Sequence, residues 1–571
     1  MIEKMTRYDF VLLSSGKDGF IDALSSLGVM DITRSAKPVD EHSAQILSHI
    51  EAVDAEINRI SKGTDARLKE LEDGLRSLGK EADSAAHWGD FDRDKLNALG
   101  LPVRFFCISE KKFDPAWAER YAIAETCREK GKVWFVAIGD TDLPAEPLAI
   151  PSRTIAELEQ EIAAQEAAVK EYKDGLESLK STLPELKADA AALRSELAVY
   201  LASVGGESAA DGELTVFEGF APTTENERLA KAFDELDCVW YSAEATVEDN
   251  PPIKLKNNKF VKQFEMLTDM YGRPDYNEFD PTPYLSVFFL LFFAMCMGDA
   301  GYGLLLIVGG ILLRKVENLK NLAPLVTILG VGTFVVGIVM HTFFGVDISA
   351  IPWVPSWLKA VMITGTIAGF EAQMVLALII GVLHLCLAMI VKTVYATRNK
   401  GFLGSLGTWG WTLLIVGGVL VGVLAMTSLV PGPVLKWIVI GLGVVSALGI
   451  FLFNDIKRNP LKNIGSGLWE TYNTATGLLG DVLSYLRLYA LGLAGGMLGK
   501  AFNDIASMTL GDGSFSFGWI FFPIILLIGH ALNFAMCCLG AFVHPLRLNF
   551  LEFFKNSGYD GKGRVYKPVT K

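Results

Sequence analysis

The chain has 571 residues and a net charge of −13, but the charge is divided unevenly along it. Residues 1–283 hold 54 Asp and Glu against 33 Lys and Arg, whereas residues 284–571 hold 11 against 19 and are strongly apolar. This division excludes a single globular domain and indicates an acidic soluble part followed by a basic membrane domain. The chain starts without the apolar stretch of a signal peptide, so the acidic part is expected in the cytoplasm.

The acidic part, residues 1–283, is expected to form an arm built on a long antiparallel coiled-coil hairpin. Apolar residues between 152 and 200 recur at alternating steps of three and four, a heptad pattern that predicts a coiled coil. A similar seam between residues 41 and 85 supplies the second helix. Pro184 is expected to kink the later helix locally.

Three strand–helix–strand patterns accompany this hairpin. The first and last are expected to form one proximal α/β lobe from residues 1–40 and 205–250. The middle pattern predicts a distal lobe within residues 101–150, with a helix over 114–131 between two strands. A charge-rich coiled coil that ends in a small lobe is typical of a structural arm, and the fold class expected for this part is α+β.

One motif in the arm is similar to a nucleotide-binding loop and is rejected. The run from Gly74 to Glu81 has the P-loop spacing, but Glu81 stands where the loop needs a hydroxyl to hold Mg²⁺. The run also lies inside a predicted helix, whereas a P-loop follows a strand. The seven cysteines include no C-x-x-C pair, so neither a disulfide framework nor a zinc site is supported. We therefore expect no cofactor, no metal and no ATP catalysis in this chain.

The membrane domain, residues 284–571, contains seven apolar runs. The first, residues 284–313, is too long for one untilted crossing and contains MGDAGYG at 297–303. If this run crosses the membrane twice, the basic loops and the C-terminal tail all face the cytoplasm, as the positive-inside rule requires. The sequence therefore predicts eight transmembrane helices with both termini in the cytoplasm.

Arg487 lies in the middle of the seventh predicted helix, which is otherwise apolar. An Arg at this depth costs at least about 2.5–3.5 kcal/mol on insertion scales, so a functional role is the default interpretation. Polar residues on its face and on the neighbouring stripe can line an ion passage. These candidates are Glu470, Asp481, Ser484 and Tyr485.

The eighth predicted helix presents another polar face, whose residues are spaced by three and four. Its candidates for the ion passage are His530, Asn533, His544 and Arg547.

Some of these residues have simpler explanations, which stay open. His544 and Arg547 can be anchors that snorkel to the cytoplasmic surface, and Asp481 can simply neutralise Arg487. Lesser candidates for the passage are Asp299, Glu371 and His384. Two further residues, His341 and Lys392, are expected only to mark helix ends.

Three motifs together resemble the membrane stator subunit of V/A-type rotary ATPases, called a in eukaryotes and I in bacteria and archaea. They are MGDAGYG at 297–303, LGDVLSYLRLYALGLAGG at 479–496 and HPLRLNFLEFFKNSGYDGKGRVYKPV at 544–569. The resemblance covers the whole chain, and the short length resembles the bacterial and archaeal versions.

The resemblance implies two offset half-channels that face a rotor ring of proteolipid subunits and couple the passage of H⁺ or Na⁺ to ring rotation. Arg487 matches the essential Arg of this family, which pairs with a ring carboxylate, and Arg547 matches its second Arg. Cys537 and Gly495 stand where some relatives have Glu and His, so relay roles do not carry over to them. The arm would bind peripheral stalks and the cap of the central stalk, with no nucleic acid partner.

Two other functions compete with this interpretation. An ion-coupled secondary transporter with a cytoplasmic coiled-coil domain would show inverted repeats with paired broken helices, but only one broken segment is evident. A membrane scaffold without a transport role would keep ion flux after the loss of Arg487.

Overall fold

The computed structural model describes residues 1–34, 39–63, 65–89, 93–98, 100–139, 143, 145–148, 153–316, 319–367, 369–427, 430–453, 460–510 and 518–570. The chain divides into two compact units, which are described separately. The first unit consists of residues 1–14, 29–32 and 208–568, and the second of residues 15–28, 33–207 and 569–571.

The first unit contains an antiparallel sheet with the strand order β2-β7-β1-β8. Its strands are β1 (Met5–Leu13), β2 (Asp31–Ile32), β7 (Leu214–Pro222) and β8 (Val239–Glu244). Side chains of β1 alternate between buried and half-buried, as expected for a strand with one face on a core. On that face Tyr8 and Phe10 pack against Phe233 of α8 (Asn226–Phe233), at ring-centroid distances of 5.3 and 5.0 Å. Strands from both ends of the acidic part therefore share one sheet.

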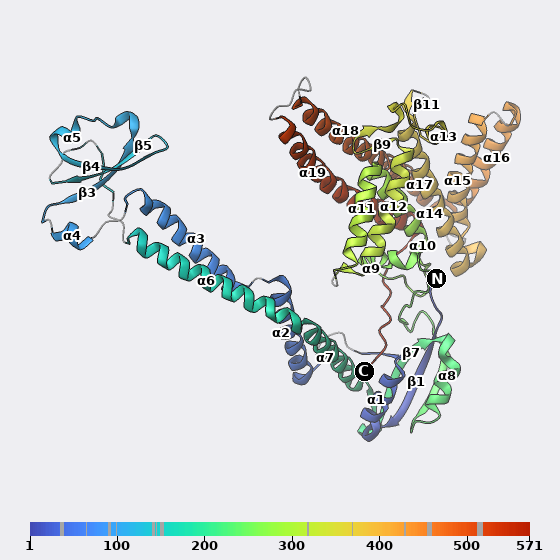
Figure 1. Cartoon of the computed structure of the whole chain (residues 1–571). Helices are drawn as coiled ribbons and strands as arrows, with labels where there is room; N and C mark the ends of the chain where they lie inside the picture. The colour runs from blue at the N-terminus through green and yellow to red at the C-terminus, as the bar shows by residue number, and fades with distance from the viewer. Residues whose placement is uncertain are drawn as a thin grey trace. The chain divides into compact units, whose positions relative to one another are not determined.

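Long helices form most of the second unit: α1 (Lys17–Leu27), α2 (Glu41–Lys62), α3 (Ala66–Ala86), α6 (Ile155–Leu179) and α7 (Leu183–Val204). Helix α2 packs beside α7, and α3 packs beside α6 (Figure 1). Leu68, Val169 and Leu176 are buried in the seam between α3 and α6, while heptad supercoiling stays a prediction. The interruption expected near Pro184 takes the form of a 3₁₀ turn at Lys180–Thr182, and Pro184 then lies in the first turn of α7.

Helix α2 begins at a capping box. The Asp40 carboxylate accepts hydrogen bonds from the Ser43 amide and from the Ser43 hydroxyl, and it accepts a third from the Tyr200 hydroxyl of α7 at 2.5 Å. The bond from Tyr200, followed by those from Ser43, lowers the pKa of Asp40 to about 2. The same contact ties the start of α2 to α7.

The second unit also contains a three-stranded antiparallel sheet in the order β3-β5-β4, formed by β3 (Val103–Ser109), β5 (Lys132–Ile138) and β4 (Ala122–Glu129). The helix predicted over 114–131 is therefore wrong, and only the short α5 (Trp117–Arg120) is helical there. Lys130 and Gly131 both have positive φ, as a two-residue hairpin turn requires. Pairing with β5 through this turn overrides the helical propensity of the Ala- and Glu-rich segment.

The apolar part of the first unit is helical: α10 (Thr282–Met297), α11 (Ala300–Leu313), α12 (Ala323–Val339), α14 (Ala372–Gly404), α15 (Leu406–Thr427), α16 (Gly432–Phe451), α17 (Pro460–Ser484), α18 (Leu486–Met508) and α19 (Gly518–Arg547). Among the described residues, five helical stretches are long and apolar enough to cross a membrane, with α17 and α18 counted as one stretch. Helices α10, α11 and α12 are shorter apolar helices, so eight crossings remain a prediction.

The break expected at 297–303 separates α10 from α11. Gly298 ends α10 with a positive φ of 59°, and its α-carbon lies so close to Gly492 of α18 that an added Cβ would be 3.3 Å from it. Asp299 then caps α11 by accepting hydrogen bonds from the Gly301 and Tyr302 amides. The break therefore brings a carboxylate into the interior next to α18.

The end of the first unit departs from regular α-helix. A π-helix, Leu548–Phe553, follows α19 directly and leads into the short α20 (Phe554–Ser557). Phe553 is fully buried and stacks on His384 of α14, with ring centroids 4.7 Å apart. Leu548, Asn549, Glu552 and Phe553 of this turn consequently belong to the packed interior of the helical bundle, whereas Leu551 is exposed.

Candidate ion pathway

Arg487 lies at the start of α18, just after a one-residue interruption at Tyr485 between α17 and α18. Its Nη1 is buried without a hydrogen-bond partner, and none of the described residues forms an ion pair with it. Asp481 does not fill that role: its carboxylate accepts a hydrogen bond from Asn556 at 2.8 Å and lies 3.8 Å from the Lys555 ammonium. The guanidinium thus carries a charge that the described part of the chain leaves unpaired.

His544 lies close enough to both Arg487 and Arg547 to feel their charges. Its Nδ1 is buried without a hydrogen-bond partner, whereas Arg547 is exposed at the end of α19. Helices α18 and α19 pack against each other, and His544 of α19 comes near Arg487. Whether His544 and Arg547 are snorkelling anchors or part of an ion passage stays open, as the sequence left it.

A pocket of about 260 Å³ lies along the polar stripe of α17. Glu470 and Asp481, both predicted to line a passage, contribute to its wall together with Asn473 and Lys392. Ser484 lies one turn beyond Asp481, and its hydroxyl donates to the Gly480 carbonyl at 3.1 Å. We refer to this cavity as the Asp481 pocket.

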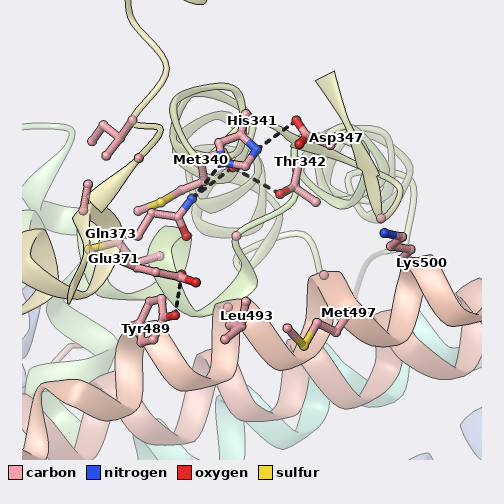
Figure 2. Close-up of a pocket in the computed structure, with 18 of the residues that line it drawn as sticks. Met340, His341, Thr342, Asp347, Glu371, Gln373, Tyr489, Leu493, Met497 and Lys500 are labelled. Atoms are coloured by element: carbon pink, nitrogen blue, oxygen red, sulfur yellow. Dashed lines mark hydrogen bonds and ion pairs between the residues drawn. The ribbon is translucent and has the colours of Figure 1, made fainter. Parts of the chain in front are cut away.

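A second pocket, of about 500 Å³, is lined by α18, the start of α14 and the loop before it (Figure 2). The Tyr489 hydroxyl donates to Glu371 at 2.5 Å, and His341 pairs with Asp347 at 3.1 Å. Lys500 lies at its other end. We refer to this cavity as the Tyr489 pocket.

The two pockets lie at different heights of the helical bundle. Gln373 of α14 lines the Tyr489 pocket and Met389 of the same helix lines the Asp481 pocket. Sixteen residues of α-helix correspond to about 24 Å. Along the chain, Arg487 stands between Asp481 of one pocket and Tyr489 of the other.

Tyr485 lines neither of these pockets. Its side chain is fully buried, its hydroxyl pairs with His384 Nδ1 at 2.9 Å, and an added Cβ at Gly381 would touch its ring at 2.3 Å. Tyr485 therefore locks the interruption between α17 and α18 against α14.

His530 and Asn533 also line neither pocket, because they belong to a buried network with residues that sequence patterns do not connect. His530 pairs with Tyr302 at 2.8 Å and with Asn503 at 2.9 Å, and Asn533 donates to the Tyr302 hydroxyl at 2.8 Å and to the Gly495 carbonyl at 2.9 Å. We call Asp299, Tyr302, Asn503, His530 and Asn533 the Asp299 cluster.

Asp299 anchors this cluster through backbone amides alone. Beyond its bonds to α11, it accepts from the Phe344 amide at 2.8 Å and from the Gly345 amide at 2.7 Å. Its carboxylate is 1% exposed and accepts four hydrogen bonds, so its charge is satisfied without a cation.

Glu552 is a residue that the sequence analysis missed. It lies in the π-helix, is 4% exposed, and has an Oε2 without a hydrogen-bond partner. It was counted as part of the basic tail, although it is the single acidic residue of the apolar segment Phe550–Phe554. Charges on Asp481 and Arg547 both act on its carboxyl. We call Arg487, His544, Arg547 and Glu552 the Arg487 cluster.

Comparisons with known proteins support the resemblance seen in the motifs. The model of the V-type ATPase 116kDa subunit family matches residues 150–329. The A-type ATP synthase subunit I of Methanocaldococcus jannaschii is 32% identical over 62% of this chain and 54% of that protein, and the one of Pyrococcus abyssi is 34% identical over 56% and 48%. The chain thus spans about half the length of these archaeal relatives.

Other matches cover more of the chain. The V-type ATP synthase subunit I 1 of Treponema pallidum is 25% identical over the full length of both proteins. A crystal structure of the cytoplasmic N-terminal domain of a subunit I, homolog of subunit a, of V-ATPase aligns over 42% of this chain and 100% of that chain, at 13% identity and a TM-score of 0.21. The family match and the named relatives together show that this chain is similar to subunit I of the A-type and V-type ATP synthases.

Proposed function

We propose that this chain is a stator subunit that forms two ion half-channels against a rotor ring and couples the passage of H⁺ or Na⁺ to rotation of that ring. The observation that carries the proposal is the half-buried guanidinium of Arg487, whose Nη1 is buried without a hydrogen-bond partner and which stands along the chain between residues of two separate pockets. An uncompensated charge in such a position is expensive, so a carboxylate from another polypeptide is the natural partner.

In this proposal the Asp481 pocket is the half-channel open to the cytoplasm and the Tyr489 pocket is the half-channel open to the other side. Arg487 attracts the ring carboxylate in its ionised form and prevents direct passage of ions between the pockets. Near Arg487, Arg547 adds positive potential and His544 adds a polar ring nitrogen. The chain itself does no ATP chemistry.

The proposal extends to topology and partners. Eight crossings with both termini in the cytoplasm agree with the distribution of Lys and Arg. The paired helices of residues 41–86 and 155–204 provide a stiff arm for peripheral stalks and for the cap of the central stalk, which hold the chain still against the torque of the ring.

ATP-driven ion uptake into vesicles that contain the complete complex tests the proposal. Arg487→Ala and Arg487→Lys are expected to reduce uptake by about 100-fold or more, which corresponds to the loss of an interaction of about 2.7 kcal/mol. Lys436→Ala is a matched control, because Lys436 is an exposed basic residue of α16. Subunit pull-down shows that each variant assembles. Normal uptake by an assembled Arg487→Ala complex rejects the half-channel proposal and leaves a scaffold role.

A further inference from the structure

Glu552 is a buried acid that the proposed function does not yet use. Its side chain is 4% exposed, and its Oε2 has no hydrogen-bond partner. No described residue forms an ion pair with it, since Lys555 is 64% exposed and points to Asp481 instead. A carboxylate that is buried without pairing is costly, and ionisable groups retained inside a membrane bundle commonly serve ion or proton pathways.

The surroundings of Glu552 connect it to the Asp481 pocket. Asn556 Nδ2 donates to the Asp481 carboxylate at 2.8 Å and to the backbone carbonyl of Glu552 at 2.6 Å, so one amide links Asp481 to the helical turn that carries Glu552. The Ser484 side chain lies next to the Glu552 carboxyl, one turn along α17 from Asp481. Asp481 itself lines the pocket, whereas Glu552 lies behind it in the packed interior.

The backbone brings Glu552 to this position by an irregular turn. The π-helix of Leu548–Phe553 begins directly after Arg547, and Asn549 Nδ2 donates to the carbonyl of Pro545, a residue without an amide proton. A π-turn changes the direction of the side chains that follow it, and such turns occur often at functional sites. Phe553 next to Glu552 packs on His384, which anchors the turn.

The chemistry around Glu552 favours a proton over a metal cation as the ion that it carries. A metal cation needs a shell of several oxygen ligands. Here the Asn556 amide directs its NH₂ group at Asp481, and the Lys555 ammonium lies 3.8 Å from the same carboxylate. Both groups repel a metal cation. A proton needs one acceptor atom, and Glu552 Oε2 is such an atom.

We propose that Glu552 is the proton-relay residue of the half-channel that opens at the Asp481 pocket. An O–H bond forms on Oε2 with a proton from the pocket side and breaks when the proton passes toward the ring carboxylate near Arg487. The reverse order operates in the opposite direction of rotation. The inference rests on the proposed function and adds two points to it: Glu552 as a residue of the pathway, and H⁺ as the ion that passes.

The test compares Glu552→Gln and Glu552→Asp in vesicles that contain the complete complex, with H⁺ uptake followed by a pH-sensitive dye and Na⁺ uptake followed with ²²Na⁺. Glu552→Gln keeps the shape of the side chain but binds no proton. It is expected to reduce H⁺ uptake by about 100-fold, the lower end of what proton transfer by a positioned side chain contributes. Glu552→Asp is expected to restore at least a tenth of the wild-type rate, with a shifted dependence on pH.

Asp560→Asn is the matched control, since Asp560 is an acidic residue of the same tail that is 68% exposed and paired with Lys562; it should pump normally. Normal H⁺ uptake by Glu552→Gln overturns the relay, and if Arg487→Ala is inactive in the same assay, the half-channel proposal still holds. Uptake of Na⁺ instead of H⁺ by the wild-type complex also overturns the proton relay. If Glu552→Gln does not assemble, an unchanged pH profile of Glu552→Asp overturns the relay.

Discussion

The Asp299 cluster and the Arg487 cluster are both polar groups inside the same bundle of apolar helices, but they differ in how their atoms are paired. Every polar side chain that we place in the Asp299 cluster has hydrogen-bond partners at 2.7–3.2 Å. Arg487, His544 and Glu552 each keep a buried atom without one. Because a buried polar atom is stabilising only when it is paired, the first cluster holds the fold together and the second costs stability. A protein tolerates such a cost where function requires it.

The largest effect on stability is expected from Asp299→Ala. Loss of the carboxylate leaves four buried backbone amides unpaired, and at about 1–3 kcal/mol each the free energy of unfolding should fall by about 4 kcal/mol or more. Heat- or denaturant-induced unfolding of the purified protein in detergent measures this change in the free energy of unfolding. Asp504→Ala, an exposed position on α18, should change it by less than about 0.5 kcal/mol. Equal effects of the two substitutions would contradict the structural role of Asp299.

A smaller loss is expected from Asn533→Ala, because this substitution removes the donor to the Tyr302 hydroxyl and to the Gly495 carbonyl. The expected decrease in the free energy of unfolding is about 2 kcal/mol. Ion uptake by complexes that assemble should stay within about threefold of the wild-type rate, since a threefold change corresponds to less than 1 kcal/mol. Complete loss of uptake at normal stability would move Asn533 from the structural cluster to the pathway.

The opposite pattern is expected from Arg487→Leu. Removal of a half-buried charge that has a buried, unpaired Nη1 should leave the free energy of unfolding unchanged or raise it by about 1 kcal/mol. Uptake by the same variant should be lost. A destabilised Arg487→Leu protein would show that the guanidinium has a stabilising partner within the chain, and the contrast between the clusters would then fail.

The smallest effect is expected at Asp40, an exposed carboxylate outside the apolar helices. There, too, hydrogen-bond partners should determine how much a polar group stabilises the fold. The pKa of Asp40 is about 2, below an unfolded value of about 3.9, so its contribution to stability is present above pH of about 4 and is lost as the pH falls toward 2. Tyr200→Phe removes the largest cause of this shift. The variant should show a weaker dependence of unfolding on pH in that interval, measured on the whole chain by the dichroism of its helices. An unchanged acid profile would show that Tyr200 does not interact with Asp40 in solution.

Several site residues predicted from the sequence line a pocket or lie near Arg487, and others do neither. Asp481 and Glu470 line a pocket, and His544 lies near Arg487, because helical periodicity already places residues three or four apart on one face. Tyr485 follows the same periodicity but is fully buried against α14. Periodicity defines a face of a helix, and it does not say whether that face meets a cavity or another helix.

Two other expectations from local sequence also failed because contacts with other segments decide the structure. The segment 114–131 has the composition of a helix, yet residues 122–129 form β4 because β5 offers a partner across a two-residue turn. Glu552 was counted only as part of the cytoplasmic tail, because charge counts treat all residues after Arg547 alike. The π-helix instead returns this acid to the interior.

The sequence by itself determined the features that depend on local composition: the acidic and basic parts, the positions of the apolar helices, the break at 297–303 and the isolated charge of Arg487. Only the tertiary structure decided which polar groups are paired. Two of the four donors to Asp299 come from residues 344 and 345, about 45 residues away along the chain. The neighbours of Glu552 come from residues 481–484, more than 65 residues away. Since the free energy of a buried polar group depends on those distant partners, their identity becomes visible only in the folded chain.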